Sequence, residues 1–560
     1  MKKLEKQNVF FWVCFFVCMG IFLWRCTFSI NYYDEPYGIA VIWRYFKGGA
    51  ILAEDWHPSQ QLTAWILWPL YSFWYAVLGG NDGIILGFRI SYILFQGLIV
   101  IYCYYRLRKY NYYAVAAVLL YMFSTHNNMT TLNYNTIGIG MLMLLLTTLY
   151  TEERHYSWTY YWCGVIFAIM VLAQPYSILI FGLWGIAVCL INIIRKYEEV
   201  PQVLQLRNYL YVSLGALTVL MIFLVIVFSR AEINNVFTGI HYNLNDPEHQ
   251  MDIQYKITKY FERFYRYYKF QIISIGISAI VGLIKQMRKS EVIRFCCLIL
   301  STIAFIYTMI YHGVLSDYVP IDFMSVPMAF YGISAFAISR RKNWKLFFSW
   351  MLPGIFYTFC VQLATDTGIL AVSAATIVAS AGGMLLLAEY LREEKKYISS
   401  QLYRGMVIVL VMINIMQTGL FLYQRIYYTW WSEDVPLCTE TVQLGPAKGI
   451  KTSKEDLLWY ENTLNEIDEL KLTEDDRLLI LEHASWLYLY ADVPVATYSF
   501  WTVGEENYLK EYYEIYEEKI PTVVYVSEVD GAKEKSYIKV FQENGYTLKE
   551  YDSGNIFLTK

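Results

Sequence analysis

Long apolar runs separated by short polar loops cover the chain up to about residue 424. A helix needs about 20 apolar residues to cross the hydrocarbon core of a bilayer. Runs near that length lie at residues 8–30, 84–105, 112–125, 136–150, 159–174, 177–194, 209–229, 269–286, 293–312, 320–339, 345–364, 369–391 and 404–424. The pattern predicts an α-helical polytopic membrane protein with about thirteen transmembrane helices.

The run at 62–80 is a further candidate, and the charge of the later loops decides its status. Cytoplasmic loops collect Lys and Arg, and the N-terminal sequence MKKLEK is basic, which places it inside. If 62–80 lies along the interface without crossing, the basic loops also fall inside, at residues 106–109, 193–200, 284–289, 339–345 and 392–396. A full crossing would place all of them outside. We therefore expect 62–80 to be an interfacial helix, for which its Trp and Tyr content is suited.

This topology predicts a multi-pass cell-membrane protein with a cytoplasmic N-terminus. The loops 31–83 and 230–268 face the extracytoplasmic side, and an odd number of spans exports residues 425–560. That tail has the composition of a soluble domain, with amphipathic helices in SKEDLLWYENTLNEIDEL and EENYLKEYYEIYEEK and buried strands in RLLILE and TVVYV. We expect residues 1–424 to form the membrane domain and residues 425–560 a small extracytoplasmic α/β domain, in which His483 and Trp486 serve packing.

The composition agrees with a membrane protein and reduces the classes of ligand and partner that the chain could bind. The chain is 57% hydrophobic and only 17% charged, with a net charge of -3. No basic face is concentrated enough for nucleic acid. The 10 cysteines lie mostly inside apolar runs and show no disulfide framework or metal-ligand spacing. Neither a metal site nor a cofactor is expected.

Two adjacent acids, Asp34 and Glu35, follow the first span, in the stretch YDEPYGIAVIWRYF. Pro36 suits the first position of a helix, so both carboxylates would lie at a helix N-terminus, where the dipole stabilises them. Such a pair suits a general base that acts on a hydroxyl beside the membrane. The alternative is that Asp34 only caps the helix and Glu35 only pairs with its dipole.

The remainder of this helix is expected to lie on the membrane surface. Its apolar residues would face lipid and its basic residues would stay in water; the apolar set is Ile39, Ile42, Trp43 and Phe46, and the basic set is Arg44 and Lys47.

Cations that could hold a phosphate occur at two places. Arg89 lies early in a span, where a buried charge usually has a partner in a cavity. Lys259, Arg263 and Arg266 share one side of a helix in the second outer loop. Guanidinium groups bind phosphate in a strong, oriented way. An equally good interpretation of this loop is a basic amphipathic helix that lies on anionic headgroups.

The order of three segments carries a resemblance to a known family. An uncleaved first span is followed by YYDEPYGIAVIWRYFKGG, EDWHPSQQLTAWILWPLYSF and GFRISYILFQGLIVIYCYYRLRK. This order resembles the polyprenol-phosphate-dependent membrane glycosyltransferases with a GT-C fold, and is most similar to the protein O-mannosyltransferase and lipid A aminoarabinose transferase branch. The resemblance implies that Asp34 is the catalytic base and that Glu35 and Tyr37 shape the same pocket.

Further site residues also follow from this resemblance. His57 stands where many relatives have a Lys-Pro-Pro segment, and would assist at the phosphate or the acceptor, unless it is simply an interfacial aromatic. Relatives often have a second acid in the next outer loop, whereas HNNMTTLNYNTIG has none, which argues against a metal-dependent mechanism. In that loop Asn133, Tyr134 and Asn135 would bind sugar hydroxyls, or the loop merely caps the next helix at Asn135. Gln174 is implied to line the cavity.

The implied reaction moves a sugar from a polyprenyl-phosphate donor to a hydroxyl on a lipid, polysaccharide or protein acceptor, with inversion and without a cofactor. Two other classes stay open. One is a transporter or flippase of a lipid-linked glycan, although no internal repeat of the kind common in transporters is found. The other is a non-catalytic membrane protein that binds cell-surface polymer.

Overall fold

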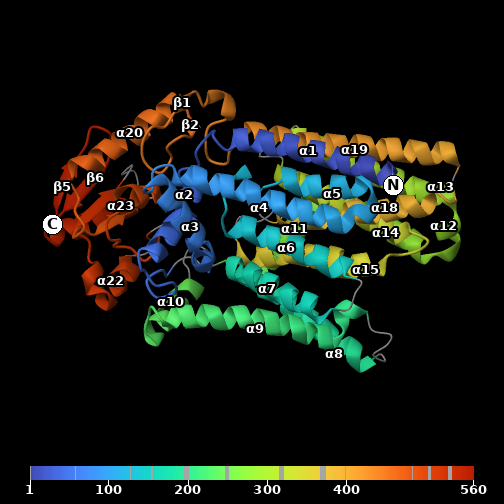
Figure 1. The fold of residues 1–560 in the computed structure, drawn as a ribbon, viewed down its shortest axis with the longest axis horizontal. Helices are drawn as coiled ribbons and strands as arrows, with labels where there is room; N and C mark the ends of the chain where they lie inside the picture. The colour runs from blue at the N-terminus through green and yellow to red at the C-terminus, as the bar shows by residue number, and fades with distance from the viewer. Residues whose placement is uncertain are drawn as a thin grey trace.

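The computed structural model describes residues 2–56, 59–125, 128–152, 156–194, 201–245, 251–314, 321–365, 372, 374–397, 399–481, 483–501, 503, 506–526 and 532–560. Long helices lie roughly side by side in a bundle, and a smaller unit with strands covers one end of it (Figure 1). Each of the apolar runs predicted to cross the membrane coincides with a helix. These helices are α1 (Lys2–Arg25), α4 (Ile84–Leu107), α5 (Tyr112–Phe123), α6 (Tyr134–Thr151), α7 (Ser157–Ala173), α8 (Ile178–Ile194), α9 (Leu206–Phe228), α11 (Ile253–Leu283), α13 (Glu291–Thr308), α14 (Ile321–Ile338), α16 (Leu352–Ala364), α18 (Ile377–Glu394) and α19 (Ser400–Tyr427).

Within the described residues, eight helices are long and apolar enough to cross a membrane, and three shorter apolar helices accompany them. The chain is therefore a multi-pass membrane protein. Leu94, Leu98 and Leu217 are among the many large apolar side chains exposed on the outside of the bundle, as a lipid environment requires.

The basic loops gather at one end of the bundle. Arg340 lies 3.6 Å from Glu291, the backbone N–H of Arg341 donates to Glu393, and Lys345 donates to the carbonyl of Glu152. Figure 1 places the N-terminus at this end and the strand-containing unit at the other. The helices thus alternate so that the described parts of the basic loops share one end, as predicted from the charge pattern; residues 195–200 of the loop at 193–200 lie outside the described residues. The assignment of that end to the cytoplasm remains a prediction.

At the opposite end, three short helices form a layer across the bundle: α2 (Asp34–Phe46), α3 (Ala64–Leu78) and α10 (Ile233–Leu244). Helix α3 corresponds to the run at 62–80. Its 15 residues span only about 22 Å, which is less than the hydrocarbon core. It packs against α2 and α4 and does not extend along the bundle (Figure 1).

The C-terminal unit contains a four-stranded sheet in the order β3 (Leu478–Ile480), β4 (Val523–Val526), β6 (Ile556–Thr559) and β5 (Thr547–Glu550). Strands β3 and β4 are parallel and the other neighbours antiparallel. The accompanying helices are α20 (Lys454–Glu469), α21 (Trp486–Ala491), α22 (Glu506–Ile515) and α23 (Ala532–Glu543). The predicted helices and strands of the tail are all present. The fold is thus a helical membrane bundle with a small C-terminal α/β unit.

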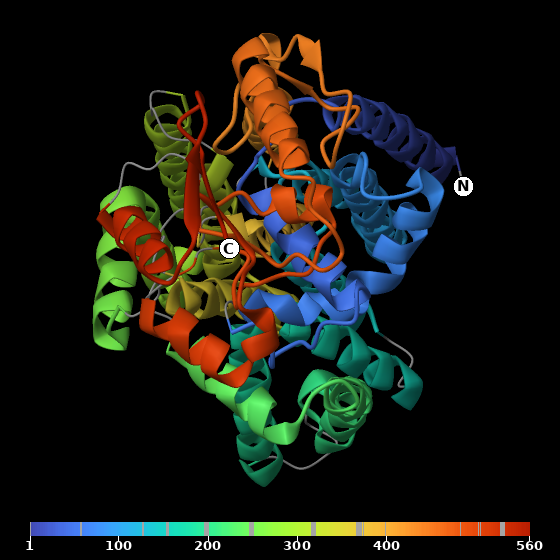
Figure 2. The ribbon, with the colours of Figure 1, turned by 90° about the vertical axis from the view of Figure 1, so that its left-hand side faces the viewer.

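This unit is hydrogen-bonded along the outer loops of the bundle. The N–H of Ser29 donates to Lys451 at 2.7 Å, and the N–H of Trp56 donates to Tyr498 at 2.9 Å. Viewed onto the C-terminal unit, α2 and α3 lie in blue behind and between its orange and red elements (Figure 2). Helix α2 is therefore enclosed between the bundle and the C-terminal unit.

This enclosure corrects one expectation about α2. Ile39, Ile42 and Trp43 are buried in a protein core and do not face lipid. Arg44 is also buried and does not stay in water: it donates to Asp55 at 2.6 Å and to the carbonyl of Thr497 at 2.8 Å. A helix covered on both faces has little free surface for lipid: Phe46 is half-buried, and Lys47 and Gly48, past the end of the helix, are exposed.

Candidate functional site

The two acids that open α2 have different surroundings. Glu35 is 1% exposed and forms an ion pair with Arg89 through two hydrogen bonds, one of them 2.9 Å from Arg89 Nε to Glu35 Oε1. The remaining N–H groups of Arg89 donate to the carbonyls of Cys26, Phe28 and Ser29. All five donors of this guanidinium are therefore used inside the protein. The pair positions α2 against the bundle, and this arrangement favours a positioning role for Arg89 over the predicted role as a phosphate ligand.

The start of α2 is capped by Asn31. Its side-chain Oδ1 accepts the backbone N–H groups of Tyr33 at 2.9 Å and Asp34 at 2.7 Å. Side-chain oxygens commonly satisfy the first free N–H groups of a helix in this way. The interpretation of Asp34 as the cap is therefore wrong, because Asn31 takes that role.

Asp34 is half-buried, and its carboxylate accepts one long hydrogen bond, 3.4 Å from Asn31 Nδ2. Burial raises the pKa of Asp34 to about 6; the Asn31 hydrogen bond opposes this rise and the nearby charge of Glu35 adds to it. A carboxyl group with such a pKa is ionised at neutral pH and can still take up a proton, which suits a general base.

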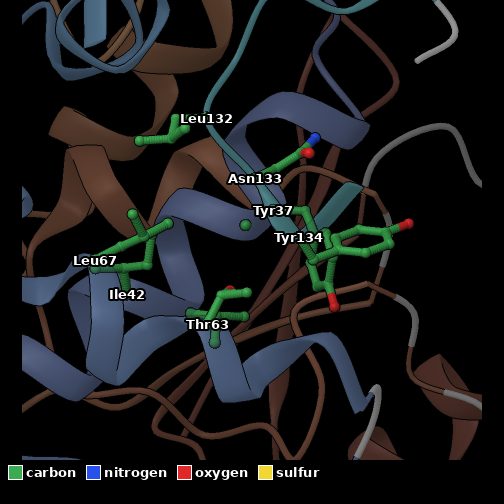
Figure 3. A pocket seen from close by; sticks show the side chains of 9 residues that line it. Tyr37, Ile42, Thr63, Leu67, Leu132, Asn133 and Tyr134 are labelled. Atoms are coloured by element: carbon green, nitrogen blue, oxygen red, sulfur yellow. The ribbon is translucent and has the colours of Figure 1, made fainter. Parts of the chain in front are cut away.

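A shallow pocket, with about 280 Å³ of empty space that includes open solvent, lies along the same face of α2. Residues 34, 37, 38 and 41 recur at three- and four-residue spacing, which places Asp34 one turn before the residues of α2 that line this pocket. The pocket is lined by Tyr37, Gly38, Val41, Ile42, Thr63, Leu67, Leu132, Asn133 and Tyr134. Figure 3 shows Tyr37, Asn133 and Tyr134 on one side of it and Ile42 and Leu67 on the other. Although these side chains include polar residues, the surface that they offer to the pocket is mostly apolar.

Tyr37 and Asn133, two of the predicted binding residues, are brought together by this pocket. Asn133 also caps α6: its side chain accepts the N–H of Thr136 at 3.1 Å, and Thr136 Oγ1 accepts the N–H of Asn133. The helix cap expected at Asn135 lies at Asn133 instead.

Gln174 lies behind the pocket in a buried polar network. Its Nε2 donates to Asn135 at 3.0 Å, and its Oε1 accepts the hydroxyl of Tyr357 at 2.6 Å. Gly138 leaves room for this side chain, because a Cβ there would lie 2.1 Å from Gln174 Oε1. Gln174 therefore connects α6 with α16 and does not line the pocket.

The basic residues of the second outer loop lie on the first half of α11. Lys259 is paired with Glu262 at 2.8 Å, Arg263 is half-buried and Arg266 is exposed. None of the three lines the pocket beside Asp34. His57 lies outside the described residues. Among the described residues, no three His, Cys, Asp or Glu side chains form a group that could hold a metal ion.

The sequence did not indicate that residues of the C-terminal unit surround Asp34. The carbonyl of Trp430 accepts Asn31 Nδ2 at 2.8 Å. The ring of Trp431 packs edge-on against Tyr33, and His483 packs against both Tyr33 and Trp501. Trp486 is buried among aromatic rings, in the packing role predicted for it. Local sequence patterns carry no signal for contacts between residues 400 positions apart.

Comparisons with known proteins give a likeness in structure alone. No family model matches the chain, and no curated protein matches it. Two solved structures of ArnT from Cupriavidus metallidurans resemble it, one bound to undecaprenyl phosphate and one in the apo state. The bound form is 12% identical with a TM-score of 0.47, and the apo form is 11% identical with a TM-score of 0.48. Both matches cover 98% of this chain and 97% of the other. At this level of similarity, the matches do not assign an activity to the chain.

Proposed function

We propose that this protein is a membrane glycosyltransferase that moves a sugar from a polyprenyl-phosphate donor to a hydroxyl acceptor on the extracytoplasmic face. The observation that carries the proposal is the position of Asp34. It is a half-buried carboxylate one turn from a pocket, and among the described residues neither an ion pair nor a helix cap accounts for it. The sequence resemblance to the GT-C glycosyltransferases gives the reaction class.

In this reaction Asp34 removes the proton of the acceptor hydroxyl as its oxygen attacks the anomeric carbon. The bond from that carbon to the phosphate oxygen breaks, and the lipid phosphate leaves with the electron pair. A single displacement of this kind inverts the anomeric centre. The pocket beside Asp34 is mostly apolar, so it can contact the first isoprene units and the apolar face of the donor sugar.

Positive charge near this end of the bundle supports departure of a phosphate. Arg25 and Arg425 are both buried, and among the described residues neither forms an ion pair with a carboxylate. Arg89 pairs with Glu35, Arg25 lies within electrostatic range of both, and Arg425 adds a third positive charge beside Arg25. The resulting excess of positive charge would attract an anionic lipid headgroup. Arg263 and Arg266 remain the proposed direct ligands of the phosphate, since Arg89 has no donor left.

The test of this proposal is a transfer assay with the full-length protein, purified in detergent or nanodiscs. A polyprenyl-phosphate sugar labelled in the sugar is incubated with envelope glycan, lipid and protein fractions. We expect labelled sugar to appear in one fraction and to depend on the protein. A protein that moves the lipid-linked sugar across vesicles but forms no glycosidic bond would overturn the proposal in favour of a flippase.

The pH dependence of transfer is expected to follow Asp34. A base acts when ionised, so the rate should increase as the pH rises through about 6 and reach a plateau above about pH 7. At pH 5 the rate should be about one-tenth of the plateau. Initial rates between pH 4.5 and 8.5, with thermal unfolding followed in parallel, give the profile. A rate that is flat between pH 5 and 7, in protein that stays folded, would contradict this assignment.

Gly38 allows a direct test of the pocket. A Cβ at this position would meet only the Cβ of Asn133, at 4.0 Å, so Gly38→Ala should fold normally and keep most activity. Gly38→Leu would extend into the pocket and displace a bound sugar, lowering the rate by about 10- to 100-fold. Both variants are compared by initial transfer rate and thermal unfolding. Equal rates for the two would show that the pocket is not used.

A further inference from the structure

A row of aromatic rings passes the N-terminus of α2 and reaches the pocket. Ring centroids lie 5.8 Å apart for Trp431 and Tyr33, 6.1 Å for Tyr33 and His483, 4.6 Å for His483 and Trp501, and 5.5 Å for Trp501 and Tyr37. Three of these rings come from the chain after α19, and Tyr37 lines the pocket. The row therefore connects the outer surface of the protein with the pocket beside Asp34.

The outer end of this row is exposed. Trp431 is 56% exposed and Tyr33 is 41% exposed. Large aromatic side chains that serve only to pack a domain are usually buried, whereas exposed groups of them mark binding sites. Trp and Tyr are also the side chains that most often supply binding energy at contact surfaces.

The backbone of Trp431 is held in an unfavourable conformation. Its φ of 49° lies in the left-handed region, which is costly for a bulky residue. Such a conformation persists only where neighbouring contacts enforce it, and is concentrated at functional sites. The segment around Trp431 is held on both sides: the carbonyl of Trp430 accepts Asn31, and Ser432 shares a 2.8 Å hydrogen bond with Ser29. Asn31 is also the cap that positions Asp34.

We propose that the indole of Trp431, with Tyr33 packed edge-on against it, forms a stacking platform for a sugar ring of the acceptor, and that the acceptor is therefore a glycan. This inference rests on the proposed transferase function. The C–H bonds on one face of a pyranose ring form an apolar surface that stacks on indole and phenol rings, while its hydroxyl groups remain in water. The donor occupies the pocket, and the acceptor approaches it along the aromatic row, which ends at Tyr37. Asp34 lies at the start of α2, one turn before Tyr37, where it can take the proton of the attacking hydroxyl.

The variant Trp431→Gly tests the role of the indole ring without changing the backbone conformation. Glycine adopts a positive φ without strain, so this change removes the indole and leaves the fold intact. Trp431→Phe retains an aromatic surface. Trp158 provides a control. It is also exposed, at 65%, but it lies at the start of α7, at the basic end of the bundle and away from Trp431.

The experiment measures binding of labelled tetrasaccharides to the full-length protein in nanodiscs, using gluco-, galacto-, manno- and N-acetylglucosamine-configured probes. We expect at least one probe to bind, Trp431→Gly to weaken its association at least tenfold, and Trp431→Phe to weaken it less than threefold. Trp158→Ala should leave binding unchanged. Failure of all probes to bind would overturn the platform, as would unchanged binding by Trp431→Gly.

Transfer kinetics separate this inference from the function on which it rests. If Trp431 forms the platform, Trp431→Gly should raise KM for a glycan acceptor at least tenfold and leave kcat largely unchanged. If transfer requires Asp34 but this KM does not change, the transferase stands and the platform is wrong. If Trp431→Gly abolishes glycan binding but no lipid donor supports transfer, the platform stands and the transferase is wrong.

Transfer to a Ser- or Thr-containing peptide that is insensitive to Trp431→Gly would indicate a protein acceptor. A loss confined to vesicle association would indicate a lipid anchor. Either outcome overturns the platform.

Discussion

Asp34→Asn is expected to abolish sugar transfer and to leave the protein folded. The amide has nearly the shape of the carboxylate but cannot accept the acceptor proton, and a positioned base contributes about 10²- to 10⁴-fold to a rate. Folding should not suffer, because the helix cap is supplied by Asn31 and the ion pair by Glu35. The loss should appear in kcat, with donor binding little changed. Initial transfer rates and thermal unfolding of the purified variant measure the two effects.

Two further variants make this result specific. Asp34→Glu keeps a carboxylate but displaces it by one methylene, so it should retain part of the activity. Asp492→Asn removes a carboxylate that pairs with Lys47 at the same end of the protein, and should leave the transfer rate near that of the wild type. If Asp34→Asn has full activity, Asp34 is not the base. If Asp492→Asn lowers the transfer rate as much as Asp34→Asn does, the effect comes from the total negative charge at this end of the protein and not from one catalytic base.

The helices and the C-terminal unit were predictable because their signals are local. An apolar run of sufficient length predicts a spanning helix wherever it occurs, and the alternation of basic loops predicted that they share one end of the bundle. In the tail, the last four residues of TVVYV form β4, and all four are buried, as a short apolar run bounded by polar residues predicts. These inferences need only neighbouring residues.

The surroundings of α2 were not predictable in the same way. Amphipathicity suggested that Trp43 faces lipid, but a lipid surface and a docked protein domain favour the same apolar pattern. Arg44 was expected in water, yet it bonds Asp55 in the loop after α2 and Thr497 in the C-terminal unit, and the second partner becomes visible only once that unit is placed. Similarly, a partner for Arg89 was expected, but Glu35 was assigned to catalysis from its position beside Asp34. Asn31 could have been found from the sequence, because an Asn three residues before the start of a predicted helix fits the role of a helix cap.

The separation of roles between the two acids leads to a second large effect, on stability. Glu35→Gln is expected to destabilise the protein by about 3–5 kcal/mol, because it leaves the guanidinium of Arg89 buried without a counter-charge. Arg89 and Glu35 are 2% and 1% exposed, so water cannot replace the lost partner. Thermal unfolding in detergent measures the loss. The double variant Arg89→Met/Glu35→Met should recover much of this stability, because it buries no charge at all.

The more exposed pair of Lys259 and Glu262 is the matched control, for which Glu262→Gln should leave the unfolding temperature nearly unchanged. A Glu35→Gln protein that unfolds like the wild type but transfers no sugar would show that Glu35 acts in the reaction, and would return it to the catalytic role that the sequence suggested.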